Sequence, residues 1–108
     1  MHTESGSRTG VADTIDSIAY AYSQLGDYAQ AVENCERALT AFRRLGDMQG
    51  EANSMLQLGD IHFASGQLEA ARRNWEQALA LLNQVPGTDK SEAISRLTRN
   101  GHPLGQAR

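Results

Sequence analysis

The chain has 108 residues, of which 40% are hydrophobic and 21% are charged, a composition that suits a single soluble globular domain. Its formal net charge of −3 argues against a nucleic-acid-binding surface, which requires a cluster of basic residues. No apolar run approaches the roughly 18 residues of a membrane span, and the N-terminal MHTESGSRTG lacks the pattern of a secretory signal. Because the lone Cys35 cannot form an internal disulfide, we expect a cytoplasmic protein.

In the N-terminal part of the chain, the sequence pattern predicts a tail followed by two helices. Residues 1–10 contain almost no apolar side chain, so we expect a disordered tail there. Over residues 11–25 the apolar residues follow the three-and-four spacing of an amphipathic helix, and they are Val11, Ala12, Ile15, Ile18, Ala19, Tyr22 and Leu25. Gly26 is expected to end this helix, and a second helix is predicted over residues 28–45, closed by Gly46.

Two further helices are predicted in the second half of the chain. The third covers residues 48–65 and the fourth residues 68–84, with Gly66 at the turn between them. The fourth helix is expected to end before Pro86, because a proline disfavours helical backbone in the residue that precedes it.

A short fifth helix is predicted over residues 89–100, with Ile94 and Leu97 on one apolar edge. We expect it to act as a cap on the fourth helix and to cover the outward apolar stripe there, which includes Trp75 and Leu79. Residues 101–108 are predicted to form a second disordered tail, since they offer little to bury.

One stretch of the chain occurs twice in similar form. The sequence GDYAQAVENCERAL at residues 26–39 returns as GQLEAARRNWEQAL at residues 66–79, always 40 positions later. Upstream of this stretch, the same offset of 40 residues aligns Ala12 with Ala52 and Ile18 with Leu58. A fixed period of about 20–50 residues is typical of solenoid proteins, in which similar units stack side by side.

These residues resemble the tetratricopeptide repeat family. The family's first-helix positions correspond to Ile15, Ile18, Ala19 and Tyr22, then to Met55, Leu58, Gly59 and His62, and its second-helix positions to Ala31, Cys35, Ala38 and Leu39, then to Ala71, Trp75, Ala78 and Leu79. The resemblance covers roughly residues 11–85, although the period is longer than the family's usual value of about 34.

The resemblance implies an all-α fold, a right-handed superhelical solenoid of two helix-turn-helix repeats and a C-terminal capping helix. Its boundaries are about 11–47 for the first repeat, 48–86 for the second and 89–100 for the cap, within one domain of residues 11–100. If each helix pair packs antiparallel, Ala19 faces Ala31 and Gly59 faces Ala71, which lets the helices approach closely.

The sequence gives no support for catalysis, a cofactor or a metal. His2 and His102 lie in the predicted tails, and His62 stands at a packing position, without the three or four ligands that a metal site needs. Cys35 is expected to be a buried structural residue rather than a nucleophile. Trp75 is expected in the core rather than stacked on a nucleic-acid base, so we predict that the chain is not an enzyme.

The resemblance also implies a binding surface. In the family, residues of the first helix of each repeat line a concave groove that binds a partner's peptide or helix. The matching positions are Asp13, Asp16, Ser17, Tyr20, Ser23 and Gln24, then Asn53, Leu56, Gln57, Asp60, Phe63 and Ala64. They include acids and no base, which favours a basic or mixed apolar partner and argues against the Lys, Arg and Asn clamp that some members use for a C-terminal carboxylate. Alternatively, the two acids of the first helix only complement its dipole and Asp60 is merely solvated.

We therefore expect a protein–protein interaction module, a scaffold or adaptor, whose partner is a protein or peptide and neither nucleic acid nor membrane. The 40-residue period, together with Gly50-Glu51-Ala52 near the start of the second repeat, resembles the C-terminal repeat arrays of large bacterial signalling and transcriptional regulators. Two alternatives remain open, namely a module that senses a small ligand or signal peptide and a structural segment of an array without its own ligand. Weak self-association through the repeat ends is also expected.

Overall fold

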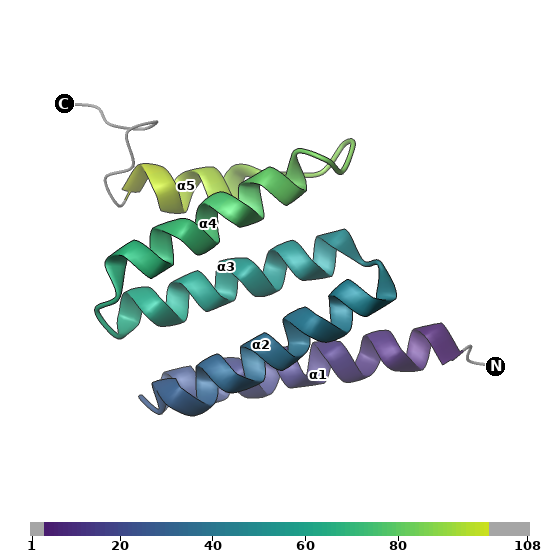
Figure 1. The fold of residues 1–108 in the computed structure, drawn as a ribbon, viewed down its shortest axis with the longest axis horizontal. Helices are drawn as coiled ribbons and strands as arrows, with labels where there is room; N and C mark the ends of the chain where they lie inside the picture. The colour runs from purple at the N-terminus through teal and green to yellow at the C-terminus, as the bar shows by residue number, and fades with distance from the viewer. Residues whose placement is uncertain (1–3, 100–108) are drawn as a thin grey trace.

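The computed structural model describes residues 4–99, and this part of the chain consists of α-helices joined by short turns (Figure 1). The helices are α1 Glu4–Gln24, α2 Tyr28–Leu45, α3 Met48–Ala64, α4 Leu68–Leu82 and α5 Ser91–Arg99. Helices that follow each other in the chain pack against each other, and the helix pairs α1–α2 and α3–α4 share the most extensive contacts. The fold is all-α, two helix-turn-helix units followed by a capping helix, as the sequence predicts.

Glycine closes three of the turns between helices. Gly26, Gly46 and Gly66 have φ values of 81°, 72° and 87°, the left-handed region that other residues adopt only with strain. An aspartate caps the N-terminus of each helix that follows the first two of these turns, and its side chain accepts a hydrogen bond from a backbone N–H of the first turn: Asp27 from Gln30 and Asp47 from Gly50. The predicted bounds of α2 are therefore reproduced at both ends.

Small residues allow the two helices of each repeat to approach closely. Ala19 and Ala31 are fully buried in one cluster with Cys35. In the second repeat Gly59 lies against the backbone carbonyl of Ala71 and beneath the indole of Trp75. These are the close contacts that the repeat register predicts, and they fix how the helices of each pair are rotated.

The first helix is longer than the sequence predicts. Residues 1–10 are expected to be a tail, but α1 begins at Glu4, and Figure 1 shows its first turns extending beyond the turn between α2 and α3. Residues 4–10 contain no proline, and once the packed part of the helix has formed, each added residue gains a hydrogen bond without a new nucleation cost. Residues 1–3 and 100–108, including the predicted C-terminal tail, lie outside the described residues.

The capping helix buries Leu97, one of the two residues predicted to cover the apolar stripe, but not Ile94. Ala93 and Leu97 are buried in the cluster that contains Trp75, with Leu79 packed against it. Ile94 is 44% exposed, so the expectation that it covers the apolar stripe is wrong. Ala93 and Leu97 are four residues apart on the helix and share a face more closely than Ile94, the neighbour of Ala93, does with Leu97. The small side chain of Ala93 also lets α5 lie close to α4.

Part of the predicted apolar stripe of α1 is also exposed. Val11 and Ile18, seven residues apart on α1, are 58% and 42% exposed and share one face of the helix, and Leu25, directly after the helix, is 80% exposed. Ile15 beside them lines an open hollow together with residues of α2. We call this surface, made by Val11, Ile15, Ile18 and Leu25, the N-terminal face.

A concave groove lined by three helices

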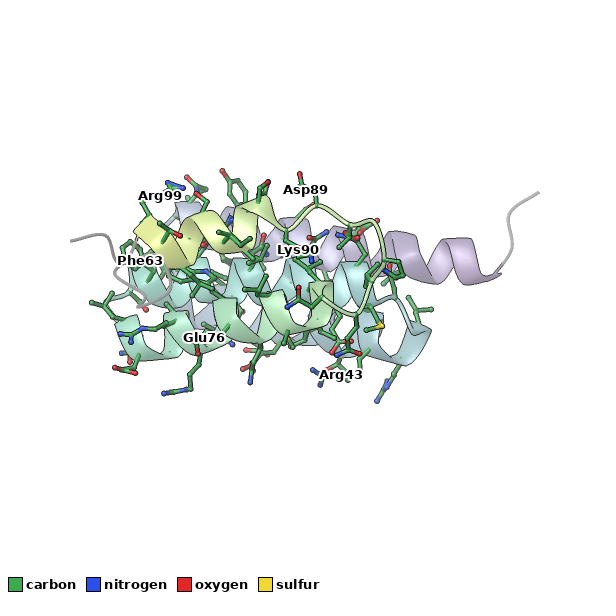
Figure 2. All side chains as sticks on the ribbon, turned by 90° about the horizontal axis from the view of Figure 1, so that it is seen from above. Arg43, Phe63, Glu76, Asp89, Lys90 and Arg99 are labelled. Carbon is green, nitrogen blue, oxygen red and sulfur yellow. The ribbon has the colours of Figure 1, made fainter. Side chains whose placement is uncertain are left out.

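The predicted groove residues line two adjoining hollows along α1, α3 and α5, of about 470 and 440 Å³, which we call the concave groove. Arg43 of α2 and Glu76 of α4 point away from the side on which α5 lies (Figure 2). Of the predicted residues, all but Phe63 line the groove, and they are Asp13, Asp16, Ser17, Tyr20, Ser23, Gln24, Asn53, Leu56, Gln57, Asp60 and Ala64. Leu56 is only 4% exposed, so it belongs mainly to the core.

Three lining residues were not predicted from the sequence, and they are Ile61 of α3 and Glu92 and Arg96 of α5. Arg96 follows Asp16 and Leu56 at intervals of 40 residues, and all three line the groove. Extending the repeat offset by one more unit is therefore the signal that could have found Arg96.

Polar contacts join α1 to α3 at the floor of the groove. The Asp16 carboxylate accepts hydrogen bonds from Ser54 Oγ and Gln57 Nε2, both at 3.2 Å, and Gln57 Nε2 also donates to the Asp16 carbonyl at 2.9 Å. Burial raises the pKa of the Asp16 carboxyl above its ordinary value, although the Ser54 hydrogen bond opposes this shift. Asp16 is thus a fixed part of the seam between the two repeats as well as an acid in the groove.

Asp60 is not an isolated solvated acid, which corrects the expectation that the groove holds no base. Arg96 donates to both of its oxygens, from Nε to Oδ1 at 2.7 Å and from Nη2 to Oδ2 at 2.8 Å. Trp75 Nε1 also donates to Oδ1, at 3.1 Å. The hydrogen bond to Asp60 raises the pKa of the Arg96 guanidinium, and the pair ties α5 to α3.

Phe63 lies in a larger adjoining hollow of about 870 Å³, which we call the Phe63 cavity. Its ring is 44% exposed and its centroid lies 5.8 Å from that of Trp75, at an angle of 44°. Asp60 and Arg96 line both this cavity and the concave groove, so the two form one continuous surface. Within the groove Tyr20 is 57% exposed, which gives a partner a second aromatic contact.

The other side chains that could carry chemistry are Cys35, Trp75 and His62. Cys35 is fully buried, its thiol donates to the Ser54 carbonyl at 3.2 Å, and burial raises its pKa to about 12, so it is not a nucleophile at neutral pH. Trp75 is 2% exposed and lies in the core, as predicted. His62 is half-buried on α3, and no group of three or more His, Cys, Asp or Glu side chains within residues 4–99 is arranged to hold a metal. His2 and His102 lie outside that part of the chain.

Comparison with known proteins agrees with the helical repeat. The sequence profile of the tetratricopeptide repeat family matches residues 10–84, and the chain belongs to that family. Tetratricopeptide repeats generally mediate protein–protein interactions, and no catalytic family was identified. No significant match was found among curated proteins or among solved structures. None of the helices described for residues 4–99 is long and apolar enough to cross a membrane.

Proposed function

We propose that this chain is a scaffold or adaptor module whose concave groove binds a peptide or helix of a partner protein. The observation that carries the proposal is the continuity of the surface, since α1, α3 and α5 line one groove that runs into the Phe63 cavity. The exposed rings of Tyr20 and Phe63 would give apolar contacts along it, as aromatic side chains do at many interfaces.

We propose further that the partner is basic, with apolar anchors. The groove carries the acids Asp13, Asp16, Asp60 and Glu92 against the single base Arg96. An excess of one sign of charge favours association with a partner of the opposite sign, and this attraction weakens as salt screens it. Arg96 neutralises Asp60, so Asp13, Asp16 and Glu92 supply the remaining excess.

The setting that the resemblance suggests is a bacterial regulatory protein in the cytoplasm, in which the 40-residue repeats form an assembly or sensor region. A module that senses a signal peptide or a small ligand would use the same groove, and we keep it as the second candidate because the groove is open to solvent. A purely structural array segment would leave the groove unused.

A displayed random peptide library selected on the full chain tests the proposal. We expect the selected peptides to be enriched in Arg and Lys beside apolar residues, and their affinity to fall with salt. Tyr20→Ser removes a ring that is 57% exposed in the groove, and we expect it to weaken binding by about tenfold or more, or about 1.4 kcal/mol. Asp13→Asn combined with Asp16→Asn should weaken it further and reduce the salt dependence.

Leu68→Ser is the matched control, because Leu68 is 56% exposed at the start of α4 and does not line the groove. Peptides that bind Tyr20→Ser and Leu68→Ser equally well would place the binding surface elsewhere. A library that yields no binder would favour the structural segment over a binding module.

A further inference from the structure

We propose that Asp60, together with Trp75 and Phe63, forms a subsite for an arginine side chain of the partner, and that the chain's own Arg96 occupies this subsite until a partner arginine replaces it. The inference rests on the proposed function, since it assumes that the groove receives a polypeptide. It goes further by naming one side chain of the partner and the group that competes with it.

The geometry around Asp60 suits a guanidinium and not an ammonium group. Arg96 donates through Nε at 2.7 Å and through Nη2 at 2.8 Å, one bond to each carboxylate oxygen. Only arginine has two parallel donors in a planar fork that matches the two oxygens, whereas lysine presents a point charge. The two hydrogen bonds from Arg96 therefore indicate that the Asp60 carboxylate is positioned to accept a guanidinium group.

Asp60 is held in this orientation by a group that does not depend on Arg96. Trp75 Nε1 donates to Asp60 Oδ1 at 3.1 Å, and the indole is 2% exposed and rests on Gly59. Because this donor is buried and packed, we expect the carboxylate to keep its position when Arg96 leaves. A preorganised carboxylate binds a new guanidinium at a lower ordering cost.

An aromatic wall stands beside the carboxylate. Phe63 lies three residues after Asp60 on α3, so both side chains point to the same side of the helix. Its 44% exposed ring faces the Phe63 cavity, which has room for the aliphatic stem and guanidinium plane of an arginine. Guanidinium groups stack on aromatic faces, which adds a second reason for arginine over lysine. Figure 2 shows Phe63 near the end of α5 that carries Arg99.

Arg96 is placed so that it can be exchanged. The side chains of Arg96 and Asp60 are 26% and 43% exposed, so solvent, and hence a ligand, reaches the pair from outside. When Arg96 leaves Asp60, Glu92 one turn away on α5 offers it another partner, since Arg96 Nη1 already lies 3.6 Å from Glu92 Oε1 and donates to the Glu92 carbonyl at 3.2 Å. The displaced guanidinium therefore does not remain without a counter-charge.

The test uses N-acetyl-L-argininamide as the probe and the full chain with Arg96→Met, which keeps an apolar stem but empties the carboxylate. The chain has a single tryptophan, so its fluorescence reports on the Asp60 side of the cavity, and an NMR titration gives the affinity. We expect Arg96→Met to bind the arginine derivative at least about tenfold more tightly than the unchanged chain does. It should also prefer this probe to N-acetyl-L-lysinamide, and to N-acetyl-L-citrullinamide, which has nearly the same shape without the charge.

Two further variants make the result specific. Adding Asp60→Asn to Arg96→Met should remove the preference for the arginine derivative. Arg99→Met is the matched control, because Arg99 lines the same cavity and carries the same charge, and it should bind no better than the unchanged chain. Circular dichroism checks that the helices persist, and if Arg96→Met unfolds α5, Arg96→Gln is used in its place.

Equal affinity for the arginine and lysine probes, or binding that survives Asp60→Asn, would overturn the subsite. The outcome is separable from that of the library experiment. If selected peptides depend on Tyr20 but show no preference for arginine at the Asp60 site, the groove binds a partner and only the arginine subsite is wrong. If no peptide is selected while Arg96→Met still prefers arginine, the subsite exists and the broader binding function is in doubt.

Discussion

Gly59 and Trp75 show, at the scale of single residues, how the two repeats solve the same packing problem with different side chains. At the equivalent positions of the first repeat, 40 residues earlier, stand Ala19 and Cys35, which are buried in one cluster. In the first repeat the small thiol of Cys35 leaves room for the methyl group of Ala19. In the second repeat the indole of Trp75 occupies the space that a Cβ at position 59 would need, so this position has to be glycine.

Gly59→Ala should therefore destabilise the chain, although alanine is the better helix former. A Cβ at this position would overlap the Trp75 ring and lie 3.1 Å from the Ala71 carbonyl oxygen, and overpacking of this kind costs about 1–3 kcal/mol. Gly10→Ala is the matched control, since Gly10 is helical and a Cβ there meets nothing within 4 Å, so it should stabilise by about 0.5–1 kcal/mol. Urea unfolding followed by circular dichroism measures both, and a loss of stability in Gly10→Ala, or none in Gly59→Ala, would contradict the packing.

At the scale of elements, α5 has two roles that involve different faces. Ala93 and Leu97 cover the apolar side of α4, while Glu92 and Arg96 extend the concave groove. A short helix such as this, nine residues long, is not stable alone in water and depends on its packing. The helix that protects the core is thus also the third wall of the candidate site.

Leu97→Ala tests the protective role of α5. Leu97 is 1% exposed, and removing most of such a side chain costs about 2–5 kcal/mol, a large share of the roughly 5–15 kcal/mol that stabilises a domain. Since Leu97 shares a cluster with Trp75, the fluorescence of Trp75 should shift to the red as α5 loosens. Ile94→Ala, on the 44% exposed side of the same helix, should change the unfolding midpoint by little. Similar effects of the two substitutions would mean that α5 is docked in another register.

The structure of the other helices could be predicted from the sequence more completely than the packing of α5. The turns at Gly26, Gly46 and Gly66 and the groove positions on α1 and α3 were predictable, because helical spacing and the 40-residue offset are properties of the chain itself. The pair between Asp60 and Arg96 was not predicted, since its members are 36 residues apart and meet only through the way α5 docks. For the same reason the choice between Ala93 and Ile94 as the buried residue required the packed structure.

At the scale of the whole molecule, the two ends of the helical stack differ. The outward side of α5 carries the hydroxyl residues Ser91, Ser95 and Thr98 around a single exposed apolar residue, Ile94. At the other end, the N-terminal face exposes Val11, Ile18 and Leu25. Of the two ends that were expected to self-associate, the N-terminal face therefore offers the larger apolar surface.

We predict that the chain self-associates weakly through this face, as a two-fold pair. Val11 stands seven residues before Ile18, and Leu25, in the turn directly after α1, stands seven residues behind it, so an antiparallel copy of α1 with Ile18 on the axis would bring Val11 near Leu25 of the other copy. A two-fold pair uses the same patch on both molecules and closes, which would limit association to a dimer. Sedimentation velocity over a range of protein concentrations measures it.

Ile18→Lys should abolish the concentration dependence, because it brings two like charges together on the axis of the pair. Ile94→Lys is the matched control, since Ile94 has nearly the same exposure, 44% against 42% for Ile18, but lies at the capped end. A sedimentation coefficient that rises with concentration in the unchanged chain and in Ile94→Lys, and stays constant in Ile18→Lys, is the expected result. If the unchanged chain is monomeric throughout, the N-terminal face is not self-complementary, and its apolar residues are better explained as a surface on which another repeat of an array would stack.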